Sequence, residues 1–129
     1  MAQDIKKIIA QEYLKCAKDP AYFMRKYCFI QHPTRGRILF NLYPFQEKAL
    51  HLFRDNQYII TLKSRQLGIS TLASAYSLWL MIFHKDKNVL ALATTQATAR
   101  NLVTKVIFMY DQLPKWLRLP HVEKNKLSL

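Results

Sequence analysis

Glycine, cysteine and acidic residues are all scarce in this 129-residue chain, and each scarcity excludes something. The only glycines are Gly36 and Gly68, so glycine-rich linkers and low-complexity tracts are excluded. Two cysteines, Cys16 and Cys28, do not suggest a disulfide framework. The four histidines have no metal-ligand spacing with the cysteines or with each other, so a metal centre of that kind is not expected.

Long apolar runs are also absent from the sequence. The longest, residues 72–83, is too short for a membrane span and is interrupted by Ser74 and Ser77. Charged residues from Asp4 onward interrupt the start of the chain, so no secretory signal peptide is expected. These features predict a cytosolic protein with no membrane partner.

The charge is strongly one-sided, with 20 basic residues against 8 acidic ones and a net charge of +12. Such an excess favours a polyanionic partner and speeds association with nucleic acid. The basic residues are scattered along the chain, however, so a solvated surface, or a fragment whose acidic half lies elsewhere, is a serious alternative. Half of the residues are hydrophobic, which is enough to form the core of roughly one domain.

The first 55 residues show helical and hairpin patterns. Apolar spacing predicts a helix over residues 4–18 with Asp4 as a plausible cap, and Pro20 can open a second helix through Tyr27. Two strands, 28–31 and 37–40, are expected to form a hairpin in which Gly36 takes a positive φ. Another helix is predicted to start with Pro44 in its first turn.

The remainder has the alternating pattern of an α/β fold. An apolar strand is predicted at residues 58–62, a largely buried helix at 69–84, and a strand at 89–95 whose unbroken apolar run is typical of a parallel sheet. Strand, helix and strand of this kind form a right-handed unit. A further helix follows at 96–110 with Thr94 or Thr95 as its cap, and residues 113–117 form a short turn against the core.

The turn between residues 62 and 72 is close to a phosphate-binding loop but departs from its rule. It reads Lys-Ser-Arg-Gln-Leu-Gly-Ile-Ser-Thr, whereas the usual loop is Gly, four residues, and Gly-Lys-Ser/Thr. Gly68 and Ser70 occupy the second glycine and hydroxyl positions, Ile69 replaces the lysine, and Lys63 stands at the first glycine. Lys63 could send its amine back across the loop to a phosphate. On spacing alone, an ordinary strand-to-helix turn with two solvated cations is an equally good interpretation.

Two further segments support the phosphate-binding hypothesis by resemblance. The loop with its lysine moved to the front resembles the Walker A loop of the large terminase subunit of tailed bacteriophages. Upstream, Tyr43-Pro44-Phe45-Gln46 resembles the adenine-recognition segment of that family. Downstream, residues 89–96 and the following helix resemble its next strand and helix. The order and spacing of all three fit, and the resemblance covers about residues 22–129.

The resemblance implies a partial P-loop NTPase of the RecA-like class, a parallel sheet flanked by helices. Residues 1–41 would form a helical and hairpin lead-in, and residues 42–129 the first part of the ATPase domain. The acidic Walker B residues, the coupling segment and the nuclease domain of the family would follow the region present here, and the chain offers no candidate for them. The fragment alone is therefore expected to be inactive.

The resemblance also assigns roles to residues, with ATP and Mg²⁺ as cofactors. Lys63 would bind the β- and γ-phosphates, and Arg65 would stabilise charge on the γ-phosphate. Ser70, or less readily Thr71, would bind Mg²⁺. Gln46 would recognise adenine, beside Tyr43 or Phe45 as a stacking neighbour. The remaining cofactor contacts would come from Ser64, Gln66, Leu67, Gly68 and Ile69.

The implied function is ATP-driven movement of double-stranded DNA into a viral prohead. The expected partners are DNA, a portal protein, the small terminase subunit and further copies in a pentamer, in the host cytoplasm and transiently at the portal. One alternative is a helicase-like P-loop ATPase, although the displaced lysine argues against it. Another is a basic, non-hydrolysing module that binds DNA or a packaging protein, which the charge of +12 favours.

Overall fold

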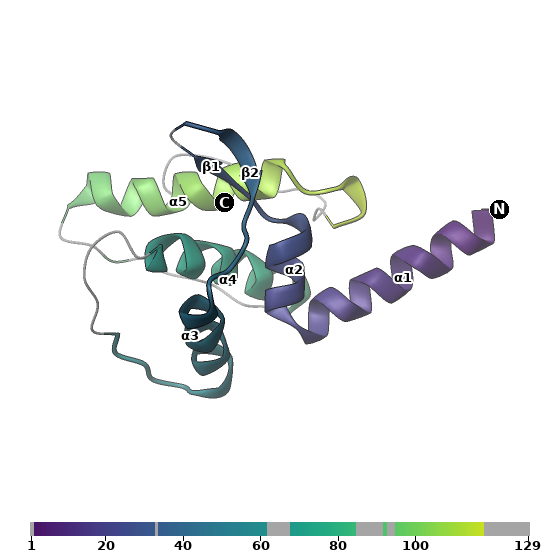
Figure 1. The fold of residues 1–129 in the computed structure, drawn as a ribbon, viewed down its shortest axis with the longest axis horizontal. Helices are drawn as coiled ribbons and strands as arrows, with labels where there is room; N and C mark the ends of the chain where they lie inside the picture. Colours follow the sequence, from purple (N-terminus) through teal and green to yellow (C-terminus); the bar gives the residue numbers. More distant parts are fainter. Residues whose placement is uncertain (1, 33, 62–67, 85–91, 93–94, 118–129) are drawn as a thin grey trace.

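Helices dominate the computed structural model, which describes residues 2–32, 34–61, 68–84, 92 and 95–117. The elements, in chain order, are α1 (Ala2–Lys18), α2 (Pro20–Tyr27), β1 (Phe29–His32), β2 (Gly36–Leu39), α3 (Pro44–Asp55), α4 (Ile69–Phe83), α5 (Gln96–Asp111) and the 3₁₀ turn η1 (Lys115–Leu117). Figure 1 shows α4 and α5 lying side by side, with α2 and the hairpin against them and α1 projecting away. The predicted helices and hairpin are confirmed, with ends shifted by one or two residues.

Local sequence explains where α2 and α5 begin. The Asp19 carboxylate accepts a hydrogen bond from the Ala21 N–H at 3.0 Å, and Pro20 occupies the first turn, where its missing N–H costs nothing. Thr95, one of the two predicted caps, accepts from the Thr98 N–H at 3.2 Å. Asp4, in contrast, lies in the first turn of α1 instead of capping it, because the helix already begins at Ala2.

The predicted parallel sheet is wrong. The described residues contain one sheet, the antiparallel pair β1–β2, in which Phe29 lies opposite Leu39. Residues 58–61 form no strand, and Tyr58 and Ile60 are 87% and 99% exposed. Leu92 and Thr95 are the described residues of the second predicted parallel strand. Both lie outside any strand, and Leu92 is 84% exposed. The P-loop NTPase fold class is therefore not what these residues form.

The physical reason is that a β-prone run becomes a strand only when a neighbour pairs with its backbone and covers its side chains. Apolar, β-branched residues at 58–61 satisfy the local preference, but no strand among the described residues lies beside them. The rest of the second run, residues 89–91 and 93–94, lies outside the described residues.

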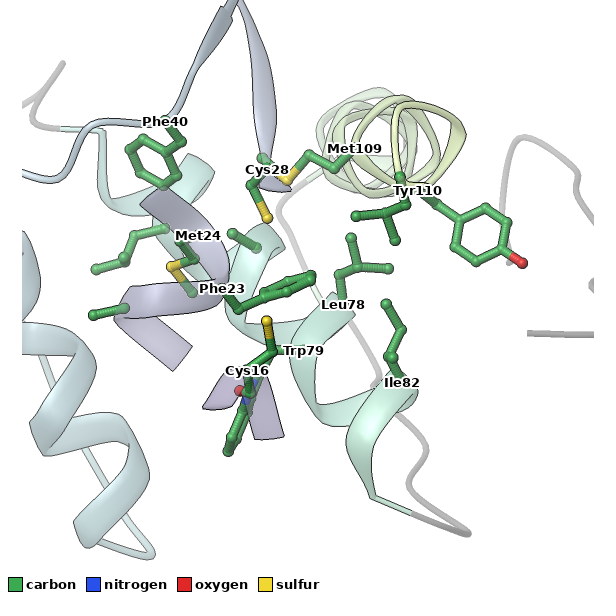
Figure 2. Close-up of a cluster of buried hydrophobic side chains, with 14 of the residues drawn as sticks. Cys16, Phe23, Met24, Cys28, Phe40, Leu78, Trp79, Ile82, Met109 and Tyr110 are labelled. Carbon is green, nitrogen blue, oxygen red and sulfur yellow. The ribbon is translucent and has the colours of Figure 1, made fainter. Parts of the chain in front are cut away.

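One hydrophobic core contains residues from both predicted segments, 1–41 and 42–129. Residues of α2 in the first segment pack directly against α4 in the second. Figure 2 shows Phe23 of α2 at the centre of this core, close to Leu78 and Trp79 of α4. Phe23 is fully buried and meets Phe83 edge-on, with the ring centroids 5.4 Å apart. Leu113 and Leu117, around η1, are also buried, which confirms the predicted turn against the core.

Helix α1 is attached to this core mainly through its C-terminal half. The Trp79 indole N–H donates to the Cys16 backbone carbonyl at 2.8 Å, which satisfies one of the last carbonyls of the helix. Tyr13 packs edge-on against Phe83 at 5.0 Å. Near the free end, Ile5 and Ile8 are 58% and 59% exposed, because α1 extends beyond the body there.

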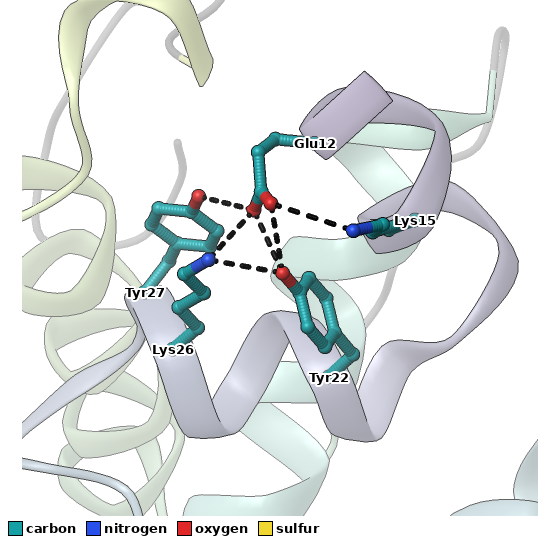
Figure 3. A network of polar contacts seen from close by, with 5 residues as sticks. All are labelled: Glu12, Lys15, Tyr22, Lys26 and Tyr27. Atoms are coloured by element: carbon teal, nitrogen blue, oxygen red, sulfur yellow. Dashed lines mark hydrogen bonds and ion pairs between the residues drawn. The ribbon is translucent and has the colours of Figure 1, made fainter. Parts of the chain in front are cut away.

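A polar network around Glu12 also ties α1 to α2 (Figure 3). Its carboxylate accepts from the hydroxyl of Tyr27 at 2.7 Å, from that of Tyr22 at 2.8 Å and from the Lys26 amine at 3.0 Å. These donors, the Tyr27 hydroxyl above all, lower the pKa of Glu12 to about 2.

The network predicts acid-sensitive stability. Because the folded pKa of Glu12 is depressed from its usual 4.5, its contribution is complete above pH 4.5 and is lost as the pH falls toward about 2. We expect Glu12→Gln to unfold at lower urea concentration than the wild type at neutral pH, with the gap narrowing below pH 4.5. Urea titrations across this range check it; a gap that does not depend on pH contradicts the assignment.

Candidate functional site

The described part of the predicted phosphate-binding loop starts at Gly68, directly before α4. Gly68 has φ +73 and ψ +16, in the left-handed region that favours glycine, and its carbonyl accepts the first helical bond from the Leu72 N–H at 2.9 Å. The N–H groups of the first turn, from Gly68 to Thr71, therefore have no acceptor within the helix. Their aligned dipoles make this end of α4 favourable for a negative charge.

Gly68 lies directly against Gln46 of α3. A β-carbon built on Gly68 would lie 2.6 Å from Gln46 Nε2, nearer than unbonded atoms approach. Two of the segments singled out by sequence, separated by more than twenty residues, are thus brought into contact. Glycine is therefore favoured at position 68 for two reasons: its backbone is left-handed, and a larger side chain would collide with Gln46.

Gln46 is itself buried, with 3% of its surface exposed. Its Oε1 accepts a hydrogen bond from the Tyr43 backbone N–H at 2.9 Å, so the side chain folds back over the start of α3. In this arrangement the Gln46 amide holds the N-terminus of α3 against the N-terminus of α4. The Oε1 atom has a second lone pair, so the bond from the Tyr43 N–H leaves one acceptor position and the Nε2 donors for another partner.

Two exposed aromatic rings flank Gln46. Tyr43 and Phe45 are 64% and 45% exposed, and their rings are nearly parallel, 8° apart in orientation, with centroids separated by 5.8 Å. Exposed, parallel rings present flat faces to solvent, which is the property that base stacking needs. Both residues predicted to stack on the base are therefore partly accessible to solvent.

The other predicted residues at the start of α4 differ in environment. Ile69, at the usual lysine position, is half-buried and packs against the hydrophobic core. A charged side chain there would lose this apolar contact, so the isoleucine has a structural explanation. Ser70 is exposed, and its carbonyl accepts from the Ser74 hydroxyl at 2.8 Å. Thr71 is half-buried.

The remaining predicted loop residues lie outside the described residues: Lys63, Ser64, Arg65, Gln66 and Leu67. Among the described residues no group of three or more histidine, cysteine, aspartate or glutamate side chains could hold a metal ion. The two residues predicted to bind Mg²⁺, Ser70 and Thr71, are both among the described residues. For phosphate and base, the free N–H groups, the left-handed glycine and the exposed rings fit the chemistry of ATP.

Sequence reasoning missed the direct contact between Gln46 and Gly68 and the use of Gln46 as a cap. The spacing from Tyr43 to Gln46 was the available signal, because a glutamine three residues after a helix cap commonly bonds back to the cap N–H. The interpretation of Gln46 as a side chain that recognises adenine stays a prediction.

No protein-family model matches this chain. Within the described residues, no helix combines the length and the apolar character needed to cross a lipid bilayer.

Proposed function

We propose that this chain binds ATP with Mg²⁺ and is the ATP-binding, N-terminal portion of a viral DNA-packaging motor of the large-terminase type. The nucleotide-binding part of this proposal does not use the parallel sheet that the resemblance implies. It rests on the meeting of two sequence segments: Gly68, at the start of α4, packs on Gln46, at the start of α3. A phosphate-binding segment and a base-binding segment need this proximity to hold one nucleotide.

In this proposal the first turn of α4 and Lys63 bind the phosphates, with Arg65 beside them, and the Ser70 hydroxyl contributes to the Mg²⁺ shell. Gln46 recognises the adenine base, with Tyr43 or Phe45 stacked on it. ATP supplies the free energy for moving double-stranded DNA, a step completed by parts of the motor outside this chain. The cellular setting would be the host cytoplasm, with transient docking at the prohead portal and to the small terminase subunit.

The direct test is calorimetric titration with Mg²⁺ and a non-hydrolysable ATP analogue. We expect Lys63→Ala to raise the Kd about 10-fold to 100-fold, because a charge-assisted bond to phosphate contributes roughly 1.5–3 kcal/mol. Lys105→Ala removes the same charge from the exposed face of α5 and is the matched control. Ile69→Ala should be mild, because its side chain contacts the core and not a phosphate.

Equal affinities in the wild type and Lys63→Ala would remove the role proposed for that lysine. No binding at all by the wild type would favour the second candidate, a basic module that binds DNA or a packaging protein without hydrolysing ATP. That candidate is supported by the net charge of +12 and by the absence of a carboxylate cluster among the described residues.

A further inference from the structure

The solvent face of α1 carries a row of lysines. Lys7, Lys15 and Lys18 lie within about 80° of one another around the helix, because they are separated by eight and three residues at 3.6 residues per turn. All three are exposed, and the Lys15 side chain retains 63% of its surface. From Lys7 to Lys18 the row spans roughly 16 Å along the helix axis.

The opposite face of α1 is the one that docks on the body. Cys16 is buried there, and Glu12 points into the network with Tyr22, Tyr27 and Lys26 (Figure 3). The C-terminal half of α1 is therefore held by its other side. Lys7 and Lys18 lie on the face away from Cys16, whereas Lys15 lies at the edge of that face, with its amine directed toward Glu12 (Figure 3).

Few acidic groups offset this row. Glu12 lies 3.9 Å from the Lys15 amine, but its oxygens already accept three shorter bonds on the α2 side. Asp4 shares the lysine face near the free end of the helix. Within the described residues, no ion pair holds Lys7 or Lys18.

We propose that this lysine face of α1 contacts the phosphates of duplex DNA. The choice of duplex DNA rests on the proposed function, whereas the choice of surface rests on α1 itself. A duplex carries one charge per about 1.7 Å of its axis with both strands counted, so a length of duplex equal to the row holds more phosphates than the row has lysines. Because α1 is anchored at Cys16 and Glu12, ordering the helix is not an added cost of binding.

An acidic protein is a weaker fit. A helix that binds a protein groove normally inserts an apolar stripe, whereas the large exposed apolar side chains nearest the lysine face, Ile8 and Leu14, lie apart on its two edges. Sequence-independent phosphate contact needs only accessible cations, and this face supplies three of them.

The test is fluorescence anisotropy of a labelled duplex of about 30 base pairs, titrated from about 50 to about 200 mM NaCl. The variant combines Lys7→Gln, Lys15→Gln and Lys18→Gln. The matched control combines Lys48→Gln, Lys105→Gln and Lys115→Gln, which removes the same charge from exposed sites on α3, α5 and η1. Far-UV circular dichroism verifies that both variants fold.

We expect the salt slope of log K to flatten by roughly 2.7 in the α1 variant, since each lost phosphate contact removes about 0.9, and to change much less in the control. Equal flattening in both variants overturns the proposal, because it would show a diffuse charge effect. An unchanged slope in the α1 variant overturns it as well. Polyglutamate competing as well as the duplex for the same lysines would also overturn it, in favour of an acidic protein.

The ATP site is measured separately on the same protein. The α1 variant should bind the ATP analogue with wild-type affinity, because the lysine face lies on a different helix from Gly68 and Gln46. Loss of DNA binding with ATP binding retained supports the lysine face whatever the outcome at Lys63.

Discussion

Gly68→Ala is expected to destabilise the fold by about 2–5 kcal/mol and to abolish measurable nucleotide binding. The left-handed backbone, at φ +73, costs an alanine roughly 1–2 kcal/mol. The new methyl group would also lie 2.6 Å from Gln46 Nε2, so the amide must move. If it moves, the Tyr43 N–H loses its acceptor, at a further cost of about 1–3 kcal/mol.

Gly36→Ala separates these two costs. Gly36 has nearly the same backbone, with φ +70, but a β-carbon there meets nothing within 4 Å. Its substitution should therefore cost only the backbone part, about 1–2 kcal/mol. Urea unfolding of the two variants gives the comparison; equal losses would contradict the crowding of Gln46.

A double-mutant cycle tests the same contact from the other side. In a Gln46→Ala background the crowded amide is gone, so Gly68→Ala should cost only the backbone part, about 1–2 kcal/mol. Additive losses would show that the two residues do not interact. Calorimetry on the folded fraction of Gly68→Ala then tests ATP binding, which we expect to fail because the new methyl group and the displaced Gln46 amide disturb the proposed site.

Much of the helical fold is predictable from sequence because its signals are local. Asp19 and Pro20 mark the start of α2 by side-chain chemistry alone, and Thr95 marks α5 in the same way. The hairpin likewise follows from Gly36, whose positive φ suits the turn. Each of these signals acts within a few residues and needs nothing distant.

The parallel sheet failed because its signal is not local. Tyr58 and Ile60 have strand propensity, yet a strand also needs a paired backbone and a covered face, and neither is present among the described residues. The resemblance to a P-loop enzyme strengthened the same expectation without adding an independent physical observation. The parallel strand that the local pattern favoured and the parallel sheet that the resemblance implies therefore failed together.

The candidate site was predictable in part. The scarcity of glycine singled out Gly68, and its left-handed backbone agrees with that interpretation. The contact with Gln46 could not be predicted, because it depends on how α3 packs against α4. The isoleucine at position 69 is similarly explained only by its place at the edge of the core.

The second large effect is expected at Phe23. This side chain is fully buried between α2 and α4, with its ring edge-on to Phe83 at 5.4 Å (Figure 2). Phe23→Ala removes a whole ring from a packed interior, which typically costs about 3–5 kcal/mol. The stability of a domain is about 5–15 kcal/mol in total. We therefore expect a large fall in the urea concentration at the midpoint of unfolding, and partial unfolding at about 37 °C.

Phe45→Ala is the matched control. It should have little effect on stability and a large effect on nucleotide affinity. Its ring is 45% exposed and stacks on Tyr43, so its loss should change stability by about 0.5 kcal/mol or less. Nucleotide affinity should nevertheless fall roughly tenfold, because base stacking contributes about 1–3 kcal/mol. If Phe45→Ala proved as destabilising as Phe23→Ala, its ring would belong to the core and the aromatic surface proposed for the base would be wrong.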